Sequence, residues 1–577
     1  MYSTLSVVLC MLSGVLSASD QSVLVTTKYG ELRGSRSLVS GQTHVDTFLN
    51  IPYAQPPVGE GRFRAPEPPV EWSGVRDATT FGPRCPQPNA PEDPPQFTFP
   101  DDEDCLVLNI YKVTFPDNED CSSSEPNICE ASENSGPLPV MVWIHGGAYT
   151  YGTANLYDST HIASKGVIVV TVNYRLDALG FLCTEDDAAM GNYGLLDVIR
   201  ALQWVRDTIS AFNGDPNNVT IFGESAGSGM TSLLLMAKKA RGLFHKAIME
   251  SGVSLSPWAV GLARSKVQPR PLDQVKTLSG KLGCDVTDTS AMVGCLRTKH
   301  AMSIINASWE MNNEFNQILF RPAVTGGDHD GLFDVTPENA LTHDQFAHVP
   351  TLRGFTKDEW THVVSDADND GISFEEFRQS LRKFLTEMFI VQPAFHNNMD
   401  TTIDRFTQAY LPRGTYPDPE QLRQILIQIA SDVMFIAPTL KEIESHAKNT
   451  AEPQYLYRFS YRSALAKSPS WQGVVHGDDI IYVFGVPFLS EFIWPAEPQN
   501  WTRDDRQLAD DVMTLWANFA KYGNPTPTAV NGINWSPWTK TTPSYLDIAS
   551  HSQMEHDLNI PSVSFPASVE NPSVLIG

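Results

Sequence analysis

The sequence lacks a long hydrophobic run beyond its first residues, and it has few basic side chains. No later apolar stretch reaches the roughly 18 residues that a membrane helix needs. Residues 572–577 are neither a hydrophobic anchor nor a retention signal. Lys and Arg total 41 against 67 Asp and Glu, and the formal net charge of −26 repels nucleic-acid phosphates and anionic lipids. We therefore expect no nucleic-acid partner and no membrane anchor.

Cysteine is scarce, with eight residues, and no two of them have the C-x-x-C spacing of a zinc site. Cys10 lies in the N-terminal apolar stretch, which leaves seven. Three pairs lie close together in the sequence, which favours three short disulfide loops formed in an oxidising compartment and leaves Cys183 as a buried thiol. The expected disulfides are Cys85–Cys105, Cys121–Cys129 and Cys284–Cys295.

The first residues are typical of a secretory signal peptide. Residues 5–16 are apolar, and the small residues Ser17, Ala18 and Ser19 suit cleavage by signal peptidase. We expect residues 1–19 to be removed and the mature protein to be secreted. Four Asn-x-Ser/Thr sequons fit this expectation and are candidates for glycosylation. They are at Asn218, Asn306, Asn500 and Asn534.

The remaining chain has the composition of a globular protein, with 41% hydrophobic and 10% aromatic residues and no internal repeat. Residues 140–144 and 167–172 are apolar and β-branched, as in strands buried on both faces of a parallel sheet. Residues 195–209 have helical spacing. This alternation predicts an α/β fold with a mostly parallel sheet flanked by helices, in one domain over residues 20–577. Residues 117–137 are expected to be an exposed insertion.

A G-x-S-x-G motif follows one of the expected strands. Residues 219–222 have a strand pattern, the motif occupies residues 223–227, and residues 230–236 are apolar as in a helix. A serine on a tight turn from strand to helix has a strained backbone, and glycines two residues to either side let neighbouring chain approach. The pattern predicts that Ser225 is a nucleophile in acyl transfer.

Such a serine needs a general base and an acid that orients the base. In this arrangement both follow the serine along the chain. His476 is the candidate base because glycines flank its loop, whereas the other late histidines lie in polar or helix-like stretches. The acid should follow a strand, and spacing alone cannot choose between Asp358 and Glu359.

The serine also needs backbone amides that stabilise the oxyanion of the tetrahedral intermediate. Residues 143–148, Trp-Ile-His-Gly-Gly-Ala, follow a buried strand, as the oxyanion loop of esterases does. The expected donors are the amides of Gly146, Gly147 and Ala226. His145 is interpreted as a structural residue that positions the loop.

Eight segments share their order and spacing with a known family. They are IPYAQPPVGEGRF (51–63), EDCLVLNIY (103–111), VWIHGGAY (142–149), VNYRL (172–176), NYGLLD (192–197), GDPNNVTIFGESAG (214–227), TKDE (356–359) and VVHGDD (474–479). Over nearly its whole mature length the chain resembles the carboxylesterase type B and cholinesterase family. The resemblance implies an α/β-hydrolase fold, family disulfides at Cys85–Cys105 and Cys284–Cys295, and Glu359 as the acid.

One departure from the family is Trp360, which stands where a glycine usually follows the acid. Non-catalytic relatives that act as adhesion proteins typically lose the serine. Because this chain keeps the serine, the acid, the histidine and the glycine loop, the sequence favours an enzyme that hydrolyses small esters and needs no cofactor.

The resemblance also bears on the substrate. Cholinesterases bind a quaternary ammonium with aromatic faces, but residues 95–99 contain no Trp, and His362 occupies the position of a second aromatic. Phe97 or Phe99 would have to replace the missing ring. Residues 316–320 keep one aromatic on the acyl side, which predicts room for butyryl or longer groups. We expect a hydrolase of uncharged esters, with a cholinesterase or a bile-salt-type lipase as the alternative.

Residues 366–371, Asp-Ala-Asp-Asn-Asp-Gly, begin like a calcium-binding EF-hand loop. The twelfth position is Phe377 and not the bidentate Glu that the loop requires. Ser373 and Glu376 instead form a capping box at the start of a helix. The sequence therefore predicts no metal site here.

Overall fold

The computed structural model of the 577-residue chain describes residues 21–40, 43–88, 99–114, 136–262, 269–315, 318–324, 332–388, 399–411, 417–489, 500–558 and 560–561. The expected signal peptide, residues 1–19, lies outside the described residues, and so does the expected Cys121–Cys129 disulfide.

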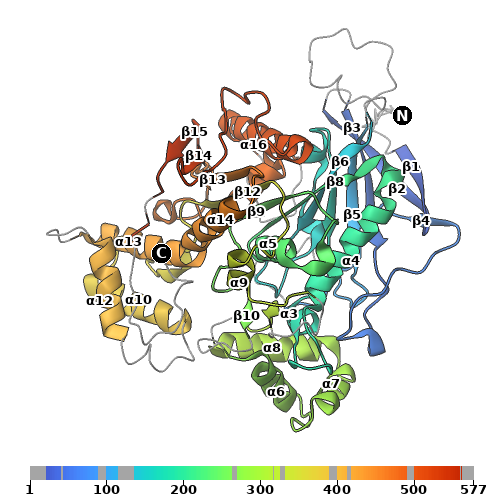
Figure 1. The fold of residues 1–577 in the computed structure, drawn as a ribbon, viewed down its shortest axis with the longest axis horizontal. Coiled ribbons are helices and arrows are strands. Elements are labelled where there is room, and N and C mark those ends of the chain that lie inside the picture. Colours follow the sequence, from blue (N-terminus) through green and yellow to red (C-terminus); the bar gives the residue numbers. More distant parts are fainter. Residues whose placement is uncertain are drawn as a thin grey trace, which may run out of the picture.

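A large sheet forms the centre of the structure (Figure 1). Within the described residues it has 13 strands, in the order β1-β2-β3-β5-β7-β6-β8-β9-β12-β13-β14-β15, with β4 beside β2. Neighbouring strands from β7 to β14 are parallel, which confirms the predicted mostly parallel centre. The strands are β1 (Gln21–Thr27), β2 (Gly30–Ser40), β3 (Thr43–Pro52), β4 (Val75–Asp77), β5 (Val107–Thr114), β6 (Leu138–Ile144), β7 (Ile168–Val172), β8 (Gly214–Glu224), β9 (Lys246–Glu250), β12 (Thr351–Thr356), β13 (Gln454–Phe459), β14 (Ser544–Ile548) and β15 (Gln553–His556).

Helices cover both faces of this sheet (Figure 1). Helices α4 and α5 pack on one face and α16 on the other. The longer helices are α4 (Tyr193–Thr208), α5 (Ala226–Met236), α6 (Pro271–Lys281), α7 (Thr289–Arg297), α8 (Ala301–Phe315), α10 (Phe374–Met388), α12 (Met399–Tyr410), α13 (Pro419–Ser431), α14 (Ala437–Asn449) and α16 (Arg503–Tyr522).

The central strands bury both of their faces, because successive side chains of a strand point to opposite sides of the sheet. On β6, Val142 packs in the core that contains α4 and α5, whereas its neighbour Trp143 packs in the core that contains α16. Such a strand has no polar face and is continuously apolar in sequence. The strands predicted at residues 140–144 and 167–172 are confirmed for this reason.

The start of α10 matches the predicted capping box. The Ser373 amide donates to Glu376 Oε2 at 2.7 Å, and the Glu376 amide donates to Ser373 Oγ at 3.2 Å. These bonds satisfy amides that have no partner inside the helix. Equivalent boxes begin α13 at Asp418 and α16 at Thr502.

The two predicted disulfides that fall within the described residues are both formed. Cys85–Cys105 has an S–S distance of 2.01 Å, and Cys284–Cys295, at 2.02 Å, joins the segment after α6 to α7. Cys183 is a buried thiol that donates to the Met190 carbonyl.

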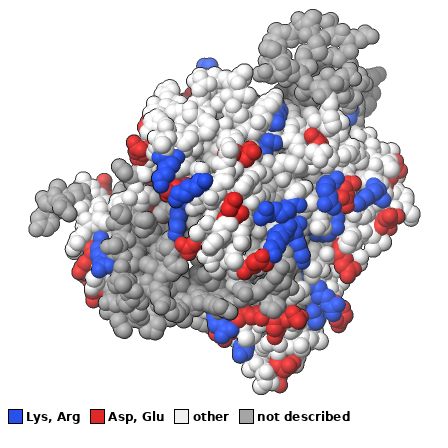
Figure 2. All heavy atoms as spheres, viewed as in Figure 1, with Lys and Arg blue, Asp and Glu red and all other residues white. Residues whose placement is uncertain are grey.

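Two surface-related findings concern the described residues only. On the face drawn in Figure 2, basic and acidic side chains are interspersed among the described residues. A search of the described helices finds none with both the length and the apolar character of a membrane span.

Candidate active site

Ser225 lies at the sharp turn between β8 and α5. Its φ of 54° and ψ of −122° are rarely adopted by residues with a side chain, and such a backbone costs on the order of 1–3 kcal/mol. Two hydrogen bonds of 2.9 Å hold the turn: the Ser225 amide donates to the Glu250 carbonyl, and the Gly229 amide donates to the Ser225 carbonyl. The strained conformation is therefore imposed by β9 on one side and by α5 on the other.

The glycines of the motif are required by the close approach of β6. A Cβ at Gly223 would lie 2.6 Å from the Ile144 carbonyl oxygen, and a Cβ at Gly227 would overlap the same atom. Gly146 fits against the nucleophile in the same way, because a Cβ there would lie 3.1 Å from the Ser225 Cβ. The glycine loop and Ser225 are thus in direct contact.

Glu359 and His476 are brought together from distant parts of the chain. The His476 Nδ1 and the Glu359 Oε2 are 2.5 Å apart. Glu359 is fully buried just beyond β12, and its Oε1 accepts a hydrogen bond of 2.8 Å from the Thr356 amide. Of the two adjacent carboxylates, it is Glu359 that contacts the histidine, whereas Asp358 accepts from the Val474 amide.

The second ring nitrogen of His476 faces a carboxylate that sequence reasoning did not identify. Its Nε2 lies 3.1 Å from Glu224 Oε1. Within the described residues, no hydrogen bond joins the Ser225 hydroxyl to His476. The imidazole is therefore held between two carboxylates. The sequence carries no signal of this contact, because Glu224 occupies the unspecified position directly before the serine of the motif.

This environment changes the acid–base properties of both groups. Burial raises the pKa of Glu224, and the charge of a protonated His476 opposes that rise. Burial also disfavours the charged form of His476, but the Glu224 and Glu359 carboxylates outweigh that effect and raise the pKa of His476 to about 9. The two carboxylates thus stabilise the protonated form of His476.

His145 packs against the glycine loop and holds it in place. This buried side chain stacks on Tyr174 with ring centroids 4.4 Å apart, and its Nδ1 lies 2.8 Å from the Gly146 carbonyl oxygen. The Tyr174 hydroxyl donates to the His145 carbonyl at 2.7 Å. Burial lowers the pKa of His145 to about 4, so the ring is neutral and the structural interpretation of this residue holds.

Three successive residues of the loop have positive φ: Gly147 at 101°, Ala148 at 54° and Tyr149 at 59°. Left-handed residues in a turn direct neighbouring amides into one concave space, which suits an anion. Among the described residues, the amides of Gly146, Gly147 and Ala148 have no acceptor. Ala148 is a further candidate donor that the sequence analysis missed, since its positive φ has no signature in an alanine.

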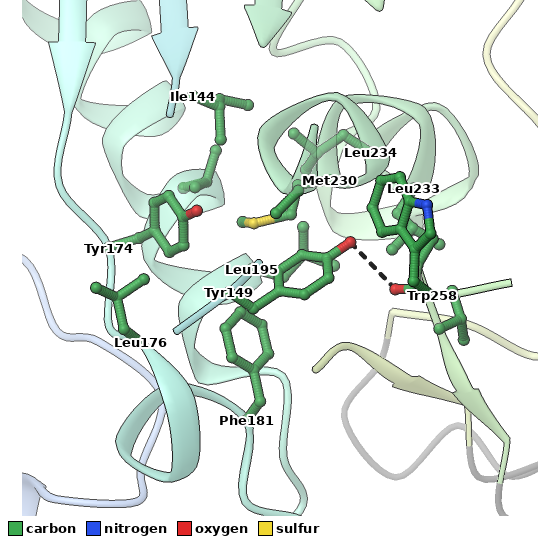
Figure 3. Close-up of a cluster of buried hydrophobic side chains, with 14 of the residues drawn as sticks. Ile144, Tyr149, Tyr174, Leu176, Phe181, Leu195, Met230, Leu233, Leu234 and Trp258 are labelled. Atoms are coloured by element: carbon green, nitrogen blue, oxygen red, sulfur yellow. Dashed lines mark hydrogen bonds between the residues drawn. The ribbon is translucent and has the colours of Figure 1, made fainter. Parts of the chain in front are cut away.

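The residue after Ala148 supports the loop. Figure 3 shows Tyr149 among Tyr174, Met230 and Trp258 in the hydrophobic cluster beside α5. Its hydroxyl donates to the Ala259 carbonyl at 3.1 Å, the bond drawn as a dashed line. The loop is therefore anchored in the same core as the helix that follows the nucleophile.

An aromatic wall lies beside the imidazole. Phe435, in a short π-helix (Asp432–Ile436), is 4.8 Å from the His476 ring, 5.7 Å from the Trp258 ring and 5.8 Å from the Trp360 ring, measured between centroids. The family departure at Trp360 is thereby accommodated, because its side chain packs on Phe435 and its amide donates to Ser431 Oγ.

The positions expected to decide choline binding are partly described. Phe97 lies outside the described residues, and Phe99 packs edge-on against Phe81 with centroids 5.7 Å apart. His362 lies edge-on to Trp360 at 6.0 Å. Of residues 316–320, Leu319 and Phe320 are described and buried.

The EF-hand-like loop uses its first carboxylate internally. Asp366 forms an ion pair with Arg423 and accepts from the Gly371 amide at 3.1 Å. The Asn369 Oδ1 accepts from the Trp471 indole at 2.7 Å. In the part of the chain that the structure describes, no cluster of three or more His, Cys, Asp or Glu suits a metal ion.

The sheet order and the turn after β8 define the α/β-hydrolase class. More narrowly, the chain belongs to the carboxylesterase family, whose model matches residues 21–565. Three relatives show the range of similarity. Neuroligin-3 of Mus musculus is 34% identical over 97% of this chain and 71% of its own length. Neuroligin-2 of Mus musculus is 33% identical over 94% and 67%, and cocaine esterase of Homo sapiens is 36% identical over 87% and 84%.

These relatives carry two kinds of name, since one names an esterase activity and the others name none. Family membership alone therefore does not decide between an enzyme and a binding protein, and the decision depends on the site.

Proposed function

We propose that the chain is a secreted serine carboxylic-ester hydrolase that acts on uncharged esters. The observation that carries the proposal is the 2.5 Å contact between Glu359 and His476, at the same edge of the sheet as the strained Ser225. A buried acid on one imidazole nitrogen orients the ring and stabilises the imidazolium that forms when the other nitrogen accepts a proton.

In the proposed mechanism, Ser225 Oγ bonds to the ester carbonyl carbon and its proton passes to His476 Nε2. The carbonyl π electrons move to oxygen, and the amides of Gly147, Ala226 and Gly146 or Ala148 stabilise that charge. The intermediate collapses by breaking the bond to the alcohol oxygen, which takes the proton from His476. Water then attacks the acyl-enzyme by the same route and releases the acid, so that no cofactor is consumed.

For the first step, His476 Nε2 must exchange Glu224 for the Ser225 hydroxyl. Catalytic hydrogen bonds are often long or misaligned without substrate and tighten when it binds. In this step Nε2 would leave Glu224 Oε1, which lies 3.1 Å away, while Nδ1 keeps its contact with Glu359.

The wall of Phe435, Trp258 and Trp360 supports an apolar substrate group beside the histidine. The Phe435 ring already packs on both indoles and on the imidazole, so the three rings offer apolar area more readily than an open cage for a quaternary ammonium. The name of the human relative, cocaine esterase, agrees with ester hydrolysis.

Secretion and a single domain over residues 20–577 are part of the proposal. Two formed disulfides support folding in an oxidising compartment. The match of one family model to residues 21–565 supports a single unit. The four sequons are proposed glycosylation sites, with the distinction among them given in the Discussion.

The second candidate is a non-catalytic binding protein. It is favoured by the absence of a Ser225–His476 hydrogen bond within the described residues. The names of the first relatives state no hydrolase activity, which leaves this candidate open. A fluorophosphonate probe, which forms a bond only with an activated serine, separates the two. Labelling of the wild type that disappears in Ser225→Ala and His476→Ala supports the enzyme.

The same variants test turnover. Ser225→Ala should remain folded and lose several orders of magnitude in kcat toward p-nitrophenyl butyrate. A folded wild-type protein that is neither labelled nor active would reject the hydrolase in favour of the binding protein. Activity over a series of acyl lengths then separates an esterase from a lipase.

A further inference from the structure

Asp358 lies beside the proposed catalytic acid but contacts the histidine loop and not the histidine. Its amide donates to the Val474 carbonyl at 2.9 Å, and its Oδ2 accepts from the Val474 amide at 3.0 Å. The acid loop and the base loop are therefore joined directly. The junction is one residue before Glu359 and two residues before His476.

The histidine loop fits closely around this carboxylate. Gly473 has a φ of 65°, and a Cβ at this position would overlap the Asp358 carboxylate. Arg462 donates to the Gly473 carbonyl and, at 3.1 Å, to Ser468 Oγ, which holds the loop from its other side. Beyond Val474, the Asp478 Oδ2 accepts from the Val475 amide at 2.9 Å and closes the turn around His476.

We propose that Asp358 is a positioning residue that sets the separation between the acid and the base. The proposal rests on the proposed ester hydrolysis. With Val474 tied to Asp358 at both its amide and its carbonyl, the backbone that leads to His476 cannot shift without breaking two hydrogen bonds. Glu359 follows Asp358 directly, so the distance between the Glu359 carboxylate and the His476 imidazole is held constant. In this arrangement Glu359 orients the His476 ring, and Asp358 positions the loop that carries His476.

This division predicts a selective kinetic effect. Asp358→Ala removes the acceptor and leaves the Val474 amide without a partner, so the loop can move away from Glu359. A displacement of about 1 Å in a catalytic group lowers turnover by about 100-fold. We expect kcat for p-nitrophenyl butyrate to fall by about 10- to 100-fold with KM nearly unchanged, because Asp358 does not line the aromatic wall. Asp358→Asn keeps an acceptor oxygen and should restore most of kcat.

A control variant removes a similar bond elsewhere. Asp285 accepts from the Thr287 amide at 2.9 Å between α6 and α7, and Asp285→Ala should leave kcat unchanged. A general loss of folding would lower the active-site titre with fluorophosphonate and not the turnover of each titrated site, so rates are expressed per labelled serine. Unchanged kcat in folded Asp358→Ala, or failure of Asp358→Asn to restore activity, would overturn the proposal.

Gly473→Ala tests the contact between Gly473 and the Asp358 carboxylate by changing the glycine. This variant replaces the first test if Asp358→Ala does not fold. The added methyl group should displace the loop and lower kcat. The double variant should lose less than the product of the two single losses, because removal of the carboxylate removes the clash. A folded Gly473→Ala with wild-type kcat would contradict the proposal.

Hydrogen exchange separates this proposal from the proposed function, because it needs no activity. Amide protection in residues 473–476 should decrease in Asp358→Ala and persist in Asp358→Asn. Unchanged protection in Asp358→Ala would reject the positioning role. An unlabelled wild type would instead reject the hydrolase.

Discussion

Glu224→Gln should move the pH range of activity toward acid. In the wild type the pKa of His476 is raised from 6.5 to about 9, although burial alone would lower it. The two carboxylates in contact with the ring, Glu224 and Glu359, supply the increase. Removing one of two such charges should lower the pKa by about 1 unit or more, each unit being worth about 1.4 kcal/mol.

The sign follows from the role of the base, which accepts a proton only when it is neutral. With a pKa of about 9, about 1% of the imidazole is neutral at pH 7, and a decrease of one unit raises that fraction about tenfold. The Glu224→Gln variant should therefore keep kcat/KM to lower pH than the wild type. Glutamine is nearly isosteric, so packing against Gly146 is preserved.

The assay is the pH dependence of kcat/KM with a neutral ester, whose acid limb reports the pKa of the free enzyme's base. Glu250→Gln is the matched control. Glu250 is also buried, but its Oε1 accepts from the Trp516 indole at 2.7 Å and it does not contact His476. Its acid limb should stay at the wild-type position. A Glu224→Gln enzyme with an unshifted acid limb would refute the reasoning, since Glu224 would then not control the histidine.

Three further predictions concern substrate, modification and stability. Steady-state kinetics should give a higher kcat/KM for a butyryl ester of a neutral alcohol than for acetylcholine, and the reverse order would make cholinesterase the better description. Glycopeptide mass spectrometry of protein from a secretory host should find no glycan at Asn218, whose side chain is held by Lys246 and by the Lys521 carbonyl, and should find glycans at the exposed sequons. Those are Asn306, Asn500 and Asn534. The free energy of unfolding should fall as the pH rises from about 6.5 to 8, because the pKa of His476 is raised to about 9 by Glu224 and Glu359 despite its burial, and burial raises that of Asp432 to about 7, so that the native state holds protons that the unfolded chain releases. Thermal melts that show increasing stability over this range would contradict the last prediction.

The parts of the site that sequence reasoning identified are local in the chain. The turn at Ser225 needs glycines at fixed offsets, and the glycine loop and the His476 loop likewise show their backbone requirements in a few adjacent residues. The buried central strands could also be predicted from the sequence, because a strand covered on both faces is apolar along its length.

The parts that it missed depend on contacts between distant segments. Asp358 and Glu359 have the same local pattern, so spacing alone left both open and only the family resemblance pointed to Glu359. The contacts that distinguish them are made with residues 474–476, more than a hundred positions later. Glu224 has no pattern that predicts its contact with His476. Phe435 reaches the histidine through a π-helix, whose extra residue shifts the side chain relative to an α-helical periodicity.

The strained backbone of Ser225 has a consequence for the evolution of this fold. Glycine has no Cβ and accommodates positive φ without strain, so replacing the serine by glycine would relieve a penalty of about 1–3 kcal/mol at a single residue. The substitution that abolishes nucleophilic catalysis is thus one that the folded state tolerates or even favours. A lineage under selection only for the shape of its surface would be expected to lose the nucleophile early and keep the scaffold. A serine at a φ of 54° thus carries a backbone strain that a glycine at the same position would not.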